Sequence, residues 1–228
     1  MNSHIYFVLD RSGSMHQFIG DTLGGFNSFI TNQKKDNADG EMSLFLFNDS
    51  VTSLYKNKPI KDVENLDDKM YYPAGTTALC DAIGQTIKYA DTQGADVNKI
   101  IVILTDGDDN SSIDYTMGHI NDLINAKKKE EGWQFVFLAA NQDAINTATH
   151  YGIGNGAAMT FDQSHTGDTF DCLSAAIGRQ ITGESQDVEF TGLERMKSCP
   201  PPEPCSPISS REVFTGVVHD SVVGLGRC

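Results

Sequence analysis

Basic residues are scarce in this sequence. Its 228 residues include 17 Lys and Arg against 31 Asp and Glu, which gives a formal net charge of −14. Proteins that bind phosphate backbones cluster Lys and Arg on one surface, so this balance argues against nucleic acid as a partner. It equally disfavours an anionic membrane surface. A surplus of carboxylates is compatible with the binding of cations.

Long apolar runs and a secretory signal are also missing. No stretch approaches the roughly 20 apolar residues of a membrane span, and the N-terminus lacks the basic region of a signal peptide. The five cysteines are odd in number and irregularly spaced, without the paired CxxC of a zinc site. These absences predict a cytoplasmic protein in a reducing setting, with no membrane anchor. Cys80 and Cys172 fall in helical patterns, where we expect them to be buried.

Apolar runs that are typical of strands alternate with segments of helical periodicity. The strand-like segments are 4–9, 42–47, 51–55, 99–104, 134–139 and 157–161. The helical segments are 17–32, 78–91, 112–129, 142–151 and 166–181. Strands that alternate with helices in this way indicate an α/β protein.

Three local features sharpen this prediction. The segment 99–104 is almost continuously β-branched, as in a strand buried on both faces of a parallel sheet. The segment 51–55 follows a turn after 42–47, so we expect the two to pair antiparallel. Gly24 and Gly25 weaken the first helix and would allow it to pack closely on the sheet. We therefore predict a doubly wound, mostly parallel central sheet with one antiparallel edge strand and helices on both faces.

The composition changes towards the C-terminus. The run 199–207 contains five prolines, which exclude a helix or an inner strand, and 213–225 is mildly apolar without a clear period. We predict one domain over residues 1–183 and a flexible, Pro- and Gly-containing extension over 184–228. The extension could instead be a short segment that binds a partner.

Oxygen-bearing side chains border the predicted strands and helices at three points. Asp10, Ser12 and Ser14 come directly after the first strand, Thr77 precedes the helix 78–91, and Asp106 follows the strand 99–104. Ligands of open α/β sheets collect at the carboxyl ends of the strands, so we expect the three loops to converge at one edge. Carboxylate and hydroxyl oxygens suit Mg²⁺ or Mn²⁺. By itself, the first motif could also be a hydrogen-bonded turn that caps the next helix.

The three loops together resemble a known family. The pattern Asp10-x-Ser12-x-Ser14, then Gly75-x-Thr77, then Leu104-Thr105-Asp106-Gly107 is similar to the von Willebrand factor type A (vWA) domain with its metal-ion-dependent adhesion site. The resemblance covers about residues 3–182 and includes the order of the elements, which implies the Rossmann-like vWA fold. The segments 137–144 and 151–153 resemble bacterial and phage members more than animal adhesion receptors.

The resemblance implies a role for each matched residue. Ser12 and Ser14 would bind the metal through their hydroxyls, Thr77 would bind it in the ligand-bound geometry, and Asp10 and Asp106 would often act through water. Thr76 is an alternative to Thr77. Neutral hydroxyls leave the charge of the cation uncompensated, so an Asp or Glu of a partner protein would complete the site. In bacterial and phage settings such domains often work in intracellular assemblies, sometimes with a partner ATPase.

Two other functions compete with this one. A Mg²⁺-dependent phosphohydrolase of a doubly wound fold usually has a second Asp two residues after its nucleophile, and position 12 is Ser here. Metal-assisted hydrolysis also needs a general base, and no His falls in the three loops. We therefore expect a binding module and not an enzyme. A scaffold with a vestigial metal site is the remaining alternative.

Residues next to the three loops have more than one possible role. Tyr71 and Tyr72 precede the Thr77 loop and could be either contact surface near the metal or cover for the core. Asp109, Ser111 or Ser112 could cap the helix predicted to start at 112.

Overall fold

The computed structural model describes residues 3–94, 97–140 and 144–201. Its strands are β1 (Ser3–Asp10), β2 (Glu41–Phe47), β3 (Val51–Pro59), β4 (Asn98–Thr105), β5 (Trp133–Ala139) and β6 (Ala158–Thr160). Its α-helices are α1 (Ile19–Asp36), α2 (Leu79–Asp91), α3 (Met117–Lys127), α4 (Ala144–His150), α5 (Thr166–Ile181) and α6 (Gly192–Ser198). A 3-10 helix, η1 (Gly13–Phe18), precedes α1.

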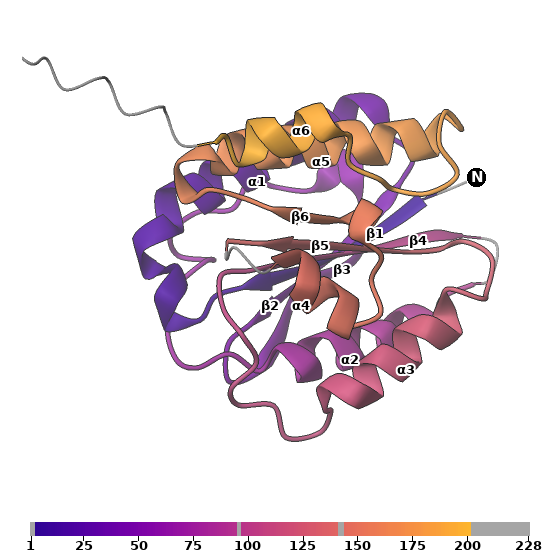
Figure 1. The fold of residues 1–228 in the computed structure, drawn as a ribbon. Coiled ribbons are helices and arrows are strands. Elements are labelled where there is room, and N and C mark those ends of the chain that lie inside the picture. The colour runs from indigo at the N-terminus through magenta and orange to yellow at the C-terminus, as the bar shows by residue number, and fades with distance from the viewer. Residues whose placement is uncertain (1–2, 95–96, 141–143, 202–228) are drawn as a thin grey trace, which may run out of the picture.

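The strands form one sheet in the order β3-β2-β1-β4-β5-β6 (Figure 1). Every pair is parallel except β2 with β3, which is antiparallel and lies at the edge. The predicted fold class is therefore confirmed. Both neighbours of β1, which are β2 and β4, run parallel to it, so the three carboxyl ends lie at the same edge of the sheet.

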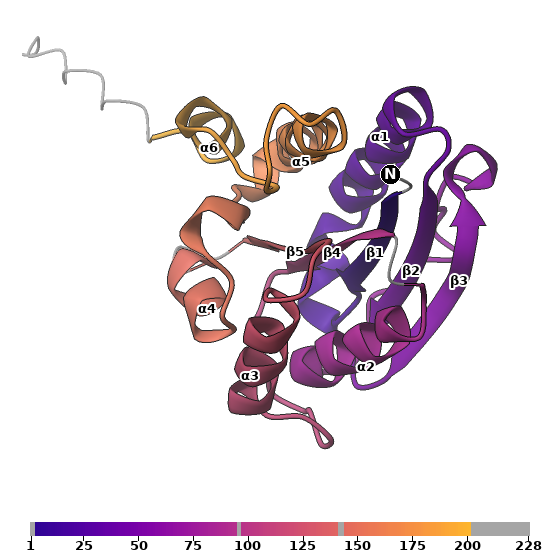
Figure 2. The ribbon, with the colours of Figure 1, turned by 90° about the vertical axis from the view of Figure 1, so that its right-hand side faces the viewer.

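Helices cover both faces of the sheet (Figure 2). α1, α5 and α6 lie on one face, whereas α2, α3 and α4 lie on the other. Side chains alternate between the two faces of a strand, so Phe7 packs under α1 and α5 while Tyr6 and Val8 pack under α2. Because the central strands are buried on both faces, their sequences are continuously apolar.

Two elements differ in extent from their predictions. α3 starts at Met117 and not near 112, and Ile113, inside the predicted helix 112–129, lies before it and is 91% exposed. β3 extends to Pro59, well past the predicted strand 51–55. Its pairing with β2 contains two register shifts, and Asn57 adopts a φ of 48°. The prediction for the start of the helix 142–151 lies outside the described residues, and α4 begins at Ala144.

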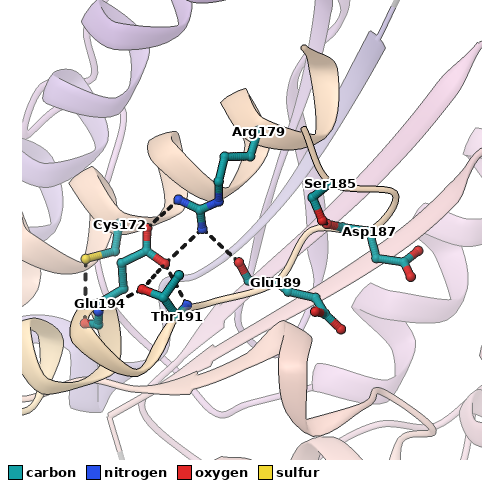
Figure 3. Close-up of polar contacts among 7 residues, drawn as sticks. All are labelled: Cys172, Arg179, Ser185, Asp187, Glu189, Thr191 and Glu194. Carbon is teal, nitrogen blue, oxygen red and sulfur yellow. Dashed lines mark hydrogen bonds and ion pairs between the residues drawn. The ribbon is translucent and has the colours of Figure 1, made fainter. Parts of the chain in front are cut away.

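Residues 184–201, which the sequence places in a flexible extension, pack against the domain. Val188 and Phe190 are buried in the core, and α6 begins with a capping box formed by Thr191 and Glu194. Both guanidinium Nη atoms of Arg179 donate to the Glu194 carboxylate, at 2.7 and 2.9 Å (Figure 3). The rest of the predicted extension, residues 202–228, lies outside the described residues.

α6 also covers the outer edge of β6. The Arg195 guanidinium donates to the carbonyl oxygens of Asn155, Gly156 and Ala158, and the Ser198 hydroxyl donates to that of Thr160. The short edge strand therefore has its outward carbonyl groups hydrogen-bonded by side chains of the same chain.

Cys80 and Cys172 are buried, as predicted from their helical positions. Among the helices in the described part of the chain, none has the length and apolar content needed to cross a lipid bilayer.

Candidate metal centre

The candidate site lies at the carboxyl edge of the sheet and is built on Asp10. This residue ends β1 and is fully buried. Its carboxylate accepts a hydrogen bond from the backbone N–H of Ser12 at 2.7 Å and another from the Thr105 hydroxyl at 2.6 Å. The bond to Ser12 N is the turn that the motif alone allows. The Ser12 side chain, however, makes no capping hydrogen bond to η1 and is free to face the site.

A chain of oxygens crosses from the β1 loop to the β4 loop. The hydroxyl oxygens of Ser12 and Ser14 lie 3.1 Å apart, and the Ser14 hydroxyl donates to the Asp106 carboxylate at 2.7 Å. Ser12 is buried, Asp106 is half-buried and Ser14 is exposed. The structure therefore brings four of the five predicted residues together, with one side of the group open to solvent.

Thr77 reaches the same edge from the third loop. Backbone bonds dock this loop on the first: Gly13 N–H donates to Gly75 O at 3.0 Å. The Thr77 side chain is buried, and its hydroxyl oxygen lies 4.0 Å from where a Cβ of Gly107 would stand. Among the described residues, this hydroxyl makes no direct hydrogen bond to the other four predicted ligands. The alternative residue, Thr76, is exposed.

The oxygen spacing suits a small divalent cation. Adjacent ligands of an octahedral Mg²⁺ at about 2.1 Å lie about 3 Å apart, and the two contacts that link Ser12, Ser14 and Asp106 measure 3.1 and 2.7 Å. Within the part of the chain that the structure describes, no group of three or more His, Cys, Asp or Glu forms a metal cluster. The candidate centre differs from such a cluster because hydroxyls supply most of its oxygens.

The electrostatics of the site favour a cation. Burial raises the pKa of Asp10 to about 6, although the hydrogen bonds from Thr105 and Ser12 oppose this shift, and the neighbouring Asp106 charge adds to it. Burial also raises the pKa of Asp106, against the effect of the Ser14 hydrogen bond. Two carboxylates that are costly to ionise side by side gain most from a positive charge between them.

The structure adds two residues that sequence reasoning did not assign to the site. Thr105 holds the Asp10 carboxylate, and the Tyr71 hydroxyl donates to the Asp10 backbone carbonyl at 2.6 Å. Tyr71 is fully buried and Tyr72 is 67% exposed, so the first is core cover and the second is surface. Thr105 belongs to the motif Leu104-Thr105-Asp106-Gly107, so its place at the site could have been predicted from the sequence. The hydrogen bond of Tyr71 joins residues 61 positions apart, and no local sequence pattern indicates it.

The loop that follows Asp106 is clamped to the start of α2. Asp109 accepts a hydrogen bond from Cys80 N, and Ser112 Oγ accepts one from Asp81 N. In return, the Asp81 carboxylate accepts from the backbone N–H groups of residues 113, 114 and 115 at 2.8 to 2.9 Å. The prediction that Asp109, Ser111 or Ser112 caps the following helix is therefore wrong, because α3 is capped by Thr116.

Replacing Asp81 with Ala should destabilise the protein by about 2 kcal/mol, because three backbone N–H groups lose their acceptor. Urea denaturation would measure the loss, and amide exchange should speed up at residues 113–115. The control is Asp81→Asn, whose remaining carbonyl oxygen can still accept from residues 114 and 115, so its loss should be smaller. Equal losses for the two variants would show that the clamp does not act through these bonds.

The fold and the candidate metal centre together define a class of protein. It is a doubly wound α/β domain with a hydroxyl-rich oxygen site at the carboxyl ends of β1 and β4. The chain belongs to the von Willebrand factor type A domain family, whose sequence profile matches residues 4–170. No curated protein matches it in sequence.

Several solved structures share the fold. A von Willebrand factor type A protein from Catenulispora acidiphila is 14% identical, with 77% of this chain and 42% of that one covered at a TM-score of 0.56. The pilus adhesin SpaC from Lactobacillus rhamnosus GG is 14% identical, with coverages of 78% and 30% and a TM-score of 0.62. Proximal thread matrix protein 1 from the mussel byssus, with a zinc-occupied MIDAS motif, is 14% identical, with coverages of 75% and 46% and a TM-score of 0.53. The chain thus spans less than half the length of each of these proteins.

Proposed function

We propose that this chain is a divalent-cation-dependent protein-binding module. Ser12, Ser14 and Thr77 would hold Mg²⁺ or Mn²⁺ through their hydroxyls, and Asp10 and Asp106 would act mainly through water. An Asp or Glu carboxylate of a partner protein would complete the coordination. The observation that carries the proposal is the continuous oxygen chain from Ser12 through Ser14 to Asp106, open to solvent at Ser14.

The metal-binding and adhesive properties of two structural neighbours support this proposal. One is a byssus protein whose MIDAS motif holds zinc, and another is a pilus adhesin. Both share the fold with this chain, and their metal-binding and adhesive properties fit the oxygen site described above. We extend these properties to the present chain as part of the proposal. The cytoplasmic location and an assembly with a partner ATPase remain predictions.

The chemistry of the site suits binding. A divalent cation held mainly by neutral hydroxyls keeps most of its positive charge and so attracts an external carboxylate. Ser14 is exposed and Asp106 is half-buried, so a partner side chain can approach the group from this side. Asp10 is instead fully buried, and both of its carboxylate oxygens accept hydrogen bonds. It orients the loop, and this position leaves it no access to a substrate as a nucleophile.

The central experiment combines metal binding with partner capture. Isothermal titration with Mg²⁺ and Mn²⁺ should show a site in the wild type and none in Ser12→Ala/Ser14→Ala, which lacks two ligands. Capture from a native lysate should lose its partner with that variant or with chelator. The matched control is Ser28→Ala/Thr92→Ala, which removes two exposed hydroxyls, one in the middle of α1 and one just after the end of α2, away from this edge.

Three outcomes would contradict the proposal. Metal binding that survives Ser12→Ala/Ser14→Ala would place the cation elsewhere. Partner recovery that is unchanged by chelator and by the variant would exclude a metal bridge. The absence of metal binding in the wild type would indicate a vestigial site. A phosphatase screen with Mg²⁺ tests the enzymatic alternative, and turnover abolished by Asp10→Asn would establish it.

A further inference from the structure

A second surface of the molecule has the form of a docking groove. It lies on the exposed side of α3 and on the loop before it, and its volume is about 400 Å³. Its lining residues are Asp114, Tyr115, His119, Asp122, Leu123 and Ala126. α3 lies on the sheet face that α2 covers, beside α2 (Figure 2). None of these residues belongs to the candidate metal centre.

The floor of the groove is apolar and held in place from below. The Tyr115 ring lies against Gly84 of α2 so closely that a Cβ at Gly84 would stand 2.6 Å from two of its ring atoms. Leu123 packs on the core with one side and lines the groove with the other. The backbone N–H of Tyr115 is fixed by Asp81. Tyr115 is therefore held by α2 from below and by Asp81 through its backbone, so this part of the groove is ordered before a ligand binds.

Exposed apolar side chains also occur in the loop before α3 and at its start. Ile113 is 91% exposed and Met117 is 41% exposed. Neither of them lines the groove, whose apolar contacts come from Tyr115, Leu123 and Ala126.

The negative charge around the groove favours a ligand that carries positive charge. Asp114 and Asp122 line it and are exposed, His119 is the other ionisable side chain besides Tyr115, and no Lys or Arg lines it. The chain as a whole carries a formal charge of −14. A ligand with apolar side chains for the floor and Lys or Arg for the two Asp residues matches both properties.

We propose that this groove binds a basic amphipathic segment of a partner protein, with its apolar side chains on Tyr115, Leu123 and Ala126 and its cations at Asp114 and Asp122. The site is independent of the metal centre, so its ligand should bind equally well in the presence of chelator. A failure to find metal binding would leave this proposal intact, and a failure of peptide binding would leave the proposed metal-dependent function intact.

Two synthetic helical peptides test the proposal on the full chain. Both carry Leu at positions i, i+3, i+4 and i+7; the first has Lys at its remaining positions and the second has Glu. The ¹H–¹⁵N spectrum of the labelled protein, with about 1 mM peptide and chelator present, detects even weak binding. The Lys peptide should shift the amide signals of residues 113–126, and the Glu peptide should leave them in place.

Variants distinguish binding in this groove from non-specific attraction of a basic peptide to an acidic protein. Ala126→Arg fills the groove with a cation at an exposed position, and Gly84→Ala displaces the Tyr115 ring from beneath; each should weaken the Lys peptide about tenfold or more. Gly178→Ala, at a helical glycine with open space around it, should change nothing. Asp114→Asn/Asp122→Asn should weaken binding and reduce its salt dependence, whereas Asp36→Asn/Asp39→Asn should have little effect.

Several results would overturn the proposal. The proposal fails if the Lys peptide shifts no signals at about 1 mM, if it shifts only signals away from residues 113–126 and the adjoining α2, or if it binds no better than the Glu peptide. Full affinity in Ala126→Arg would have the same consequence, and because Ala126 is exposed, this variant stays informative even if Gly84→Ala does not fold.

Discussion

Replacing Asp10 with Asn is expected to stabilise the metal-free protein at neutral pH by about 3 kcal/mol and to abolish its stabilisation by Mg²⁺. Burial raises the pKa of Asp10 to about 6, against 3.8 for an exposed Asp, so ionisation of this residue opposes folding when no cation is present. Each pKa unit corresponds to about 1.4 kcal/mol. Asn keeps the contacts, since its oxygen can accept from Ser12 N and its amide can donate to Thr105 Oγ1.

The same argument gives the sign of the pH dependence. A carboxyl group whose pKa is raised on folding contributes most stability below its unfolded pKa, near 4, and loses that contribution as the pH rises through about 6. Urea denaturation in chelator from pH 4 to pH 8 should therefore show a growing advantage of Asp10→Asn over the wild type. The two proteins should converge near pH 4, which serves as the internal control.

Addition of Mg²⁺ should reverse the order of the two proteins. A cation at about 1,000 times its dissociation constant stabilises the folded state by about 4.1 kcal/mol. This exceeds the deficit of about 3 kcal/mol, and only the wild type should gain it. A wild type that is indifferent to both Mg²⁺ and Mn²⁺, or an Asn variant that gains as much, would count against Asp10 as part of a metal centre.

The second large effect is expected from one of two adjacent glycines. Gly25 of α1 faces α5, and a Cβ at this position would stand 2.2 Å from Cδ2 of Phe170. The Phe170 ring cannot easily retreat, because it is fully buried and lies 6.0 Å from Phe7 and 6.3 Å from Phe29, measured between ring centroids. Gly25→Ala should therefore destabilise the protein by about 3 kcal/mol.

Gly24 provides the matched control. It is exposed, and a Cβ there would have no atom within 4 Å, so Gly24→Ala should stabilise α1 by about 1 kcal/mol through helix propensity alone. Chemical denaturation of the two variants measures both effects. A similar change of stability in both would show that the contact between α1 and α5 is more yielding than the structure indicates.

Local patterns in the sequence were enough to predict most of the fold. The helix predicted at 166–181 coincides with α5, and the β-branched run 99–104 lies inside β4. The close packing expected of the glycine pair occurs at Gly25 only, and against a helix, not the sheet. Nothing in the sequence distinguishes Gly24 from Gly25, because the difference depends on which side of α1 the distant helix α5 packs against.

The remaining details depend on contacts between distant residues. α3 starts late, after its cap Thr116, and the residues before it are held by the carboxylate of Asp81, 32 to 34 residues earlier in the chain. Residues 184–201 pack because Arg179 and the start of β5 offer partners to them. At the candidate site, the motif identified the side chains that meet, namely Asp10, Ser12, Ser14 and Asp106, but not the support that Tyr71 gives to Asp10.

The two outer strands have a consequence for crowded solutions. Arg195 and Ser198 occupy the outward carbonyl groups of β6, and β3 carries two register shifts and the exposed or half-buried Lys56 and Lys58. Neither edge in the described part of the chain offers a flat, unpaired ladder to a neighbouring molecule. Direct joining of the sheets of two copies is therefore disfavoured at both edges, and contacts between molecules would have to be made by side chains.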